Sequence, residues 1–340
     1  MLSTEPLAER SSRKKIFIHI GMNKTGSSAI QRDFFLNRHL LEENGLLYPT
    51  FGAAGAAHYE LSNFLGFSQK PNEKLGSDEF EIKRNKFDTE FSASGCQSAV
   101  FSSENFVLRG QPEDVAKFFH DHKVYIVVYL RRHDNWWVSA YNQALKMVVN
   151  PPWGPGIENY LYFHKGKKSQ VFNHRCLVDR WADVFGKENL IVRPHEKGQN
   201  LPNITTDFLN AIGHREISEK LSISKKRLNV SLPYVSMELL DIFQRLDVSD
   251  SQRSLLFQYA LSLPQDESRV EILSPEKRLE IINENMDDYK FIAREFLGRH
   301  DGTLFYEELP RAESEWVKPR PLNRVEAVQH IIRALKKTEV

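Results

Sequence analysis

A short strand-like run that leads into a glycine-bracketed loop is the feature that most constrains this fold. Residues 16–28 read Ile-Phe-Ile-His-Ile-Gly-Met-Asn-Lys-Thr-Gly-Ser-Ser. Gly21 and Gly26 permit a tight backbone path, so the amides of residues 24–28 can point inward toward an anion. A helix that starts there adds the positive end of its dipole. The segment therefore predicts a strand, a phosphate-binding loop and a helix in succession.

The position of the lysine separates this loop from that of the nucleotide triphosphatases. The two glycines fit the pattern G-x-x-x-x-G-K-[ST], but Ser27 stands where the lysine belongs, and the cation is Lys24, inside the loop. Because moving the cation changes which phosphate oxygen it can reach, an ATP-hydrolysing enzyme is disfavoured.

A second segment combines a buried strand with two arginines. Residues 124–131, Val-Tyr-Ile-Val-Val-Tyr-Leu-Arg, form a continuous apolar run typical of a parallel strand buried on both faces. The run ends in Arg131 and Arg132. Ser139 follows Arg131 by eight positions, on a helix predicted over residues 135–148. This spacing spans a strand-to-helix turn.

Together these segments resemble the sulfotransferases that use 3′-phosphoadenosine 5′-phosphosulfate (PAPS), and in particular their bacterial, carbohydrate-type branch. In that family a Lys-x-Gly-[Ser/Thr]-[Ser/Thr] loop holds the 5′-phosphosulfate. A strand-end arginine and a serine eight positions later bind the 3′-phosphate. The resemblance extends over residues 15–310 and includes the phrase Trp181…Phe185-Gly186…Glu188-Asn189-Leu190-Ile191-Val192-Arg193-Pro194.

The resemblance implies a set of co-substrate-binding residues and a reaction that needs no metal. The set comprises Lys24, Thr25, Gly26, Ser27, Ser28, Arg131, Ser139 and, in a late basic loop, Arg227. One departure leaves an alternative open. The family often has Asp/Asn-Pro after the strand-end arginine, whereas this chain has Arg132-His133, so either Arg131 or Arg132 could bind the 3′-phosphate.

Three residues are candidates for the chemistry itself. Lys24 can stabilise the charge that builds on the leaving phosphate oxygen; the alternative is an exposed loop lysine. Glu104 follows a predicted strand at 98–103 and is the first candidate for the base that takes the acceptor's proton; the alternative is a capping or salt-bridge role. His58 is the rival base, although a lone histidine is more often structural.

Composition excludes several other classes of protein. The net charge of +1 over 340 residues provides no global field for nucleic acid or for an anionic membrane surface. Cys96 and Cys176 are the only cysteines, too few for a disulfide scaffold or a cysteine zinc site. The apolar run at 124–130 is far shorter than the ~20 residues of a membrane-spanning helix. The N-terminus lacks a signal-peptide pattern, so a cytoplasmic location is expected. The resemblance to the bacterial branch fits this location, because bacteria make and use PAPS in the cytoplasm.

The order of the predicted elements indicates the fold class. Strands are expected at 15–20, 98–103, 124–130 and 189–193, and helices at 27–43, 78–92, 135–148, 174–185, 236–300 and 323–337. Strand-helix alternation predicts an α/β fold, a P-loop-like parallel sheet flanked by helices, with a mostly helical C-terminal region. In such a sheet Lys24, Glu104 and Arg131 all follow the carboxyl ends of strands, where ligands bind.

The expected domain organisation has three parts. Residues 1–14 form an N-terminal tail, and residues 15–310 form one domain with an α/β core to about residue 204. Residues 311–340 form a C-terminal tail with a helix. The aromatic stretch at 150–168 allows two interpretations, a loop for an anionic sugar or a loop folded onto its own hydrophobic cluster.

We therefore expect transfer of a sulfuryl group from PAPS to a hydroxyl or amino group of an acceptor, a saccharide or another small molecule. A P-loop kinase that uses ATP and a non-catalytic nucleotide-binding module are the alternatives. Nucleic acid and a membrane span are not expected. The sequence leaves the identity of the acceptor, the position modified and the oligomeric state open.

Overall fold

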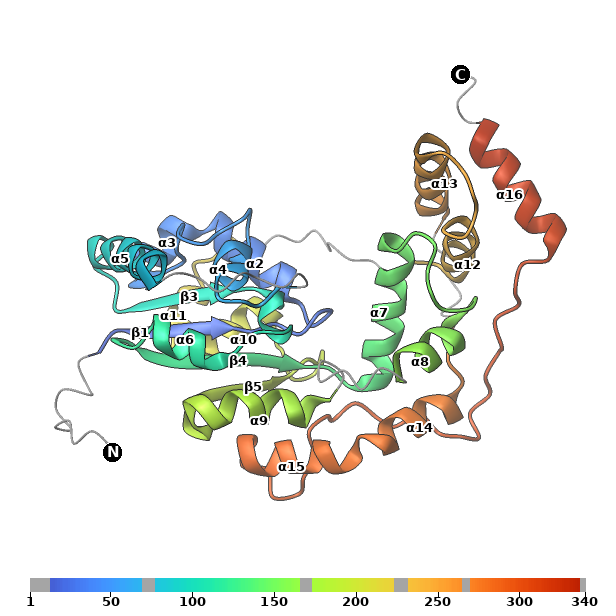
Figure 1. The fold of residues 1–340 in the computed structure, drawn as a ribbon. Coiled ribbons are helices and arrows are strands. Elements are labelled where there is room, and N and C mark those ends of the chain that lie inside the picture. Colours follow the sequence, from blue (N-terminus) through green and yellow to red (C-terminus); the bar gives the residue numbers. More distant parts are fainter. Residues whose placement is uncertain (1–12, 69–76, 166–172, 223–231, 265–269, 337–340) are drawn as a thin grey trace. The chain divides into compact units, whose positions relative to one another are not determined.

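The computed structural model describes residues 13–68, 77–165, 173–222, 232–264 and 270–336 (Figure 1). The chain divides into two compact units, between which it crosses repeatedly. Unit 1 comprises Met1–Arg131, Gln170–Leu228 and Asp287–Glu307; unit 2 comprises Arg132–Ser169, Asn229–Met286 and Glu308–Val340.

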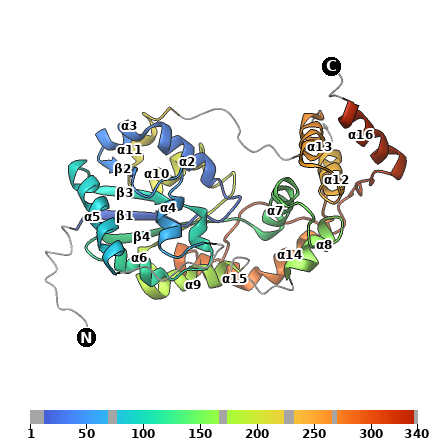
Figure 2. The same ribbon diagram turned by 45° about the horizontal axis from the view of Figure 1, so that its top comes forward.

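Unit 1 is built on a parallel sheet. Among the described residues the sheet has five strands in the order β2-β3-β1-β4-β5, and every neighbouring pair is parallel. The strands β3, β1 and β4 lie side by side in both views (Figures 1 and 2). The bounds are β1 Lys15–His19, β2 Leu46–Leu47, β3 Ser98–Ser102, β4 Lys123–Leu130 and β5 Leu190–Pro194. The predicted α/β fold class is confirmed.

Helices cover both faces of this sheet because its strands are apolar on both sides. On one face Phe17 and Val127 pack with residues of α2 (Ser27–Leu36) and α10 (Ile204–Ala211). On the other, Phe101 contacts Phe87 of α5. The other unit 1 elements are α3 (Arg38–Glu43), α4 (Tyr59–Phe64), α5 (Ser77–Ala93), η1 (Glu104–Val107), α6 (Pro112–Phe118), α9 (His174–Phe185), η3 (Lys187–Asn189), α11 (Arg215–Ser218) and α15 (Met286–Leu297).

Unit 2 is helical in its described residues. It contains α7 (His133–Met147), α8 (Ile157–Lys165), α12 (Tyr234–Phe243), α13 (Asp250–Ser262), α14 (Pro275–Glu284) and α16 (Arg324–Lys336). A cavity of about 690 Å³ lies within this unit, lined by parts of α7, α8 and α12 and by Trp316–Leu322. Glu238 of α12 holds the last of these segments, because its Oε2 accepts a hydrogen bond from the amide of Leu322 at 2.7 Å.

Two of the elements predicted from the sequence differ in detail from those in the structure. The helix predicted over 27–43 is interrupted at Asn37, where the backbone amide and the side-chain Nδ2 both donate to the carbonyl of Asp33, at 3.1 and 2.7 Å. Residues 157–165 of the predicted aromatic loop form α8. Trp153 and Tyr160 are buried there with ring centroids 5.0 Å apart, which favours the hydrophobic-cluster interpretation.

The two units are not consecutive segments of the chain. Helix α10 belongs to the sheet's own core, because Phe208 is fully buried against Phe34 and His19. Helices α12 to α14 belong to unit 2, and most of α15 belongs to unit 1. None of the helices in the described ranges is both long and apolar enough to cross a membrane.

Candidate active site

The structure brings three of the predicted site residues to one edge of the unit 1 sheet. Lys24 lies in the loop after β1, Glu104 follows β3 and Arg131 follows β4. Because β1 pairs with β3 on one side and with β4 on the other, these residues follow the carboxyl ends of three neighbouring parallel strands. The direction in which the chain crosses the sheet reverses at β1, and α/β sheets bind ligands at such switch points.

The loop after β1 has a tightly specified backbone. A Cβ atom at Gly21 would lie 2.5 Å from Ser27 Oγ, so any larger residue there would force the Ser27 side chain to move. Gly26, with φ +85°, is the N-cap of α2. Lys24 has φ +69°, which costs a non-glycine residue about 1–2 kcal/mol. Arg131 Nη1 donates a hydrogen bond to the carbonyl oxygen of Lys24 at 3.0 Å and thereby stabilises this strained conformation.

The end of α2 that faces this loop fits an anionic group. The N-cap makes no side-chain hydrogen bond, and the first turn contains no acidic residue. Ser27 Oγ is buried and has no hydrogen-bond partner among the described residues. The half-buried Lys24 and the exposed Ser28 lie on either side of it along the loop. Thr25 differs, because its hydroxyl donates to the carbonyl of Met22 at 2.5 Å, so its amide is the group left for a ligand.

The two arginines after β4 have different surroundings. Arg132 is 4% exposed, and its Nε and Nη2 donate to Asp134 Oδ1 and Oδ2 at 2.8 and 3.0 Å. Arg131 is half-buried and belongs to unit 1, with Lys24. Burial, and then the positive charge of Arg131, lowers the pKa of His195 to about 4. These surroundings favour Arg131 over Arg132 as a ligand-binding residue.

Two further members of the predicted set lie outside the described part of unit 1. Ser139 is half-buried on α7, in unit 2. Arg227 lies outside the described residues. No group of three or more histidine, cysteine, aspartate or glutamate side chains within the described ranges is arranged to hold a metal ion.

Glu104 is held by two side chains from different helices. Its Oε2 accepts hydrogen bonds from Gln31 Nε2 on α2 and from the Tyr59 hydroxyl on α4, each at 2.9 Å. The carboxylate is half-buried. Glu104 therefore lies beside the helix that begins at the glycine-bracketed loop, and it has a defined orientation.

His58 has the surroundings of a structural residue. It is fully buried, Nδ1 accepts from the amide of Ser102 at 3.1 Å, and Nε2 lies 3.0 Å from the carbonyl of Pro49. Accepting at Nδ1 places the proton on Nε2, so the ring is neutral with both nitrogens engaged. Burial lowers its pKa to about 3. The geometry favours the structural interpretation of His58 over its role as the base.

A further histidine at this edge is missed by the sequence argument. His19 ends β1; its Nδ1 lies 2.8 Å from Ser102 Oγ, and its Nε2 is buried without a partner among the described residues. Burial lowers its pKa to about 3, so the ring is neutral. The signal that could have identified it is a lone polar residue within the apolar run that leads into the loop.

Comparisons with known proteins detect only distant similarity. No protein-family model matches the chain. A curated protein of Archaeoglobus fulgidus, described only as uncharacterized, is 26% identical over 216 residues, which are 62% of this chain and 56% of that protein. The chain thus matches little more than half the length of that relative.

A solved structure is also similar in part. The crystal structure of a sulfotransferase from Alicyclobacillus acidocaldarius aligns with 72% of this chain and 92% of its own, with a TM-score of 0.37 and 15% sequence identity. At that distance the similarity assigns no activity, so function has to be inferred from the residues of this chain.

Proposed function

We propose that this protein is a sulfotransferase that transfers a sulfuryl group from PAPS to a hydroxyl or amino group of an acceptor, a saccharide in our proposal. The observation that carries the proposal is the loop after β1. Its cation is Lys24, whereas Ser27 stands at the usual position of the lysine. The N-terminal end of α2 and the Ser27 hydroxyl, which has no partner in the part of the chain that the structure describes, lie where an anion would bind.

The residues of the loop fit the 5′-phosphosulfate end of PAPS, which supplies the sulfuryl group. Lys24, the hydroxyls of Ser27 and Ser28, and the amides of residues 25–28 would hold its oxygens. Lys24 would stabilise the charge that develops on the leaving phosphate oxygen. The half-buried Lys24 adds its positive charge to that of the N-terminal end of the α2 dipole, and together they suit a strongly anionic group.

Two further roles complete the proposal. Arg131 would bind the 3′-phosphate, which ATP and ADP lack. Glu104 would take the proton of the acceptor, because it is an oriented carboxylate at the same sheet edge as Lys24 and Arg131. The proposal includes a cytoplasmic location, where a bacterial cell makes PAPS.

Ligand-dependent stabilisation tests this proposal directly. A ligand at about 100 times its dissociation constant stabilises the folded state by roughly 2.7 kcal/mol, which gives a measurable rise in melting temperature. We expect a rise with adenosine 3′,5′-bisphosphate and a smaller one with ADP or ATP. Transfer of ³⁵S-sulfate from labelled PAPS to a panel of saccharides then tests turnover.

The outcomes distinguish the alternative functions. Equal stabilisation by all three nucleotides would remove the PAPS assignment, and a larger effect of ATP would favour a kinase. Selective binding of the bisphosphate without transfer to any acceptor would identify a nucleotide-binding module that lacks turnover.

A further inference from the structure

The carboxylate of Glu104 has two inequivalent oxygens. Gln31 and Tyr59 both donate to Oε2, each at 2.9 Å, and no described residue donates to Oε1. The two donors come from α2 and α4 and lie 28 residues apart along the chain. Two donors on one oxygen restrict rotation of the carboxylate and leave Oε1 as the oxygen open to a proton.

We propose that Gln31 and Tyr59 are positioning residues that hold Glu104 so that Oε1 accepts the acceptor's proton. This inference rests on the proposed function. In the step, the acceptor oxygen or nitrogen forms a bond to sulfur while its proton moves to Oε1. The bond from sulfur to the bridging phosphate oxygen breaks, and its electron pair goes to that oxygen, beside Lys24.

Gln31 connects the base to the loop. It is 4% exposed and lies one turn into α2, the helix that begins at Ser27. Its Nε2 also lies 3.2 Å from Ser102 Oγ, which in turn lies 2.8 Å from His19 Nδ1 at the end of β1. A continuous chain of buried and half-buried hydrogen bonds therefore runs from Glu104 to the strand that leads into the loop. Such networks rigidify the groups they join.

Tyr59 contributes a donor that keeps its proton. Burial, and then the neighbouring Glu104 carboxylate, raises the pKa of Tyr59 well above its usual range, so the phenol stays neutral and donates. Tyr48 interacts electrostatically with both members of this pair and with Arg38, and His58, which precedes Tyr59, is buried and neutral. The Tyr48 hydroxyl donates to the carbonyl of Ala56 at 2.7 Å, and Arg38 Nη2 donates to the carbonyl of Pro49 at 3.1 Å. Neither hydrogen-bonds to Glu104.

Tyr59→Phe tests the proposal because it removes one donor and keeps the ring. Positioned bases contribute about 10²–10⁴-fold, so loss of orientation should lower kcat by about 10-fold or more, with KM for PAPS unchanged. Without the donor the carboxylate takes up a proton more readily, so the acid limb of the pH–rate profile should move to higher pH. Gln31→Met should act in the same direction. Tyr48→Phe is the matched control and should leave the acid limb in place.

A double-mutant cycle separates positioning from a general structural effect. In a Glu104→Gln background, Tyr59→Phe should lower kcat no further, because the base that it orients is gone. An equal loss in both backgrounds, or an unshifted acid limb, would overturn the proposal.

A carboxyl-carbon NMR titration supplies a readout that needs no turnover. The signal that disappears in Glu104→Gln identifies this carboxylate, and it should titrate at higher pH in Tyr59→Phe than in the parent protein. An unchanged titration would overturn the positioning role whatever reaction the protein catalyses. A shifted titration in a protein that fails to bind the bisphosphate selectively would retain the Tyr59–Glu104 interaction and reject the proposed function instead.

Discussion

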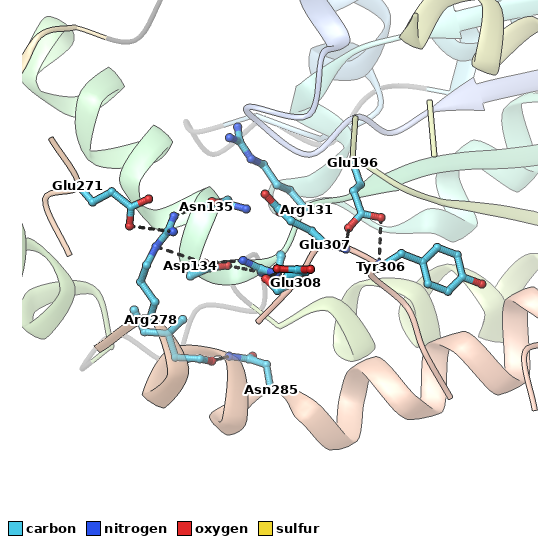
Figure 3. A network of polar contacts seen from close by, with 12 residues as sticks. Arg131, Asp134, Asn135, Glu196, Glu271, Arg278, Asn285, Tyr306, Glu307 and Glu308 are labelled. Carbon is cyan, nitrogen blue, oxygen red and sulfur yellow. Dashed lines mark hydrogen bonds and ion pairs between the residues drawn. The ribbon is translucent and has the colours of Figure 1, made fainter. Parts of the chain in front are cut away.

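Removing Arg132 should destabilise unit 2 rather than weaken nucleotide binding. Asp134 is fully buried and receives two hydrogen bonds from Arg132. Figure 3 shows its other cationic neighbour, Arg278, between Asp134 and Glu271; Arg278 Nε lies 3.4 Å from Asp134 Oδ2. Among the described residues, Arg132→Ala would leave the carboxylate with Arg278, at this longer distance, as its one remaining cationic neighbour.

The size of the effect follows from this geometry. Breaking a buried ion pair by deleting one partner costs about 3–5 kcal/mol, and the remaining Arg278 places the expected loss near the lower end, about 3 kcal/mol. With a urea m-value of about 2 kcal/mol per molar, the midpoint should fall by about 1–2 M. Asp134→Asn in the same background should recover part of this loss, because no uncompensated charge remains.

Tryptophan fluorescence is a suitable probe of this transition. Trp136, Trp137, Trp153 and Trp316 belong to unit 2, and Trp181 belongs to unit 1. Arg131→Ala provides the contrast. It should leave the unit 2 midpoint in place and weaken adenosine 3′,5′-bisphosphate binding by about 2–4 kcal/mol, with a much smaller effect on adenosine 5′-monophosphate.

Two results would refute this reasoning. If Arg132→Ala keeps the parent midpoint and selectively loses the bisphosphate, the roles of the two arginines are reversed. If Arg131→Ala weakens both nucleotides equally, its hydrogen bond to the Lys24 carbonyl supports the loop and the arginine does not recognise the 3′-phosphate.

Three further predictions concern the loop and the buried histidine. Lys24→Ala should lower turnover, measured by initial rates, by about 10²–10³-fold, and should lower nucleotide affinity, measured by titration calorimetry, by less. Normal turnover with poor binding would show that Lys24 only binds the nucleotide in the ground state. Gly21→Ala places a Cβ atom 2.5 Å from Ser27 Oγ and should reduce bisphosphate affinity at least about 10-fold while the circular dichroism spectrum stays the same. Undiminished affinity would contradict the loop geometry. His58 is neutral in the folded state, with its pKa lowered from 6.5 to about 3. Its contribution to stability is therefore present above pH 6.5 and is lost as the pH falls toward 3. The free energy of unfolding should fall by at most about 1.4 kcal/mol per pH unit in this range. His58→Gln should flatten urea-measured stability against pH below 6.5; an unchanged slope would show that His58 does not cause it.

Local sequence determined most of the secondary structure of unit 1. The apolar run at 124–130 became β4, Pro112 begins α6 as its fixed backbone angle favours, and Gly45 follows α3 with φ +81°. These features depend on residues close together in the chain, so propensity and periodicity suffice to predict them. Interruptions such as Asn37 are harder to predict, because they involve a side chain that bonds a backbone carbonyl four residues earlier.

The common location of Lys24, Glu104 and Arg131 at one sheet edge also followed from sequence. Parallel strands align their carboxyl ends, so residues that follow such strands come to the same edge whatever the order of the strands. Their assigned roles remain predictions. The order β3-β1-β4, which makes their three strands neighbours, is known only from the structure.

Contacts between distant residues were decided by tertiary structure alone. Tyr59 and Glu104 are 45 residues apart, and Arg131 and Lys24 are 107 apart, yet each pair is hydrogen-bonded. The sequence by itself determined which residues carry charge, flexibility and helix or strand preference at the loop. Only the folded chain decided which of them hold one another in place, because hydrogen bonding and burial depend on neighbours that chain distance does not reveal.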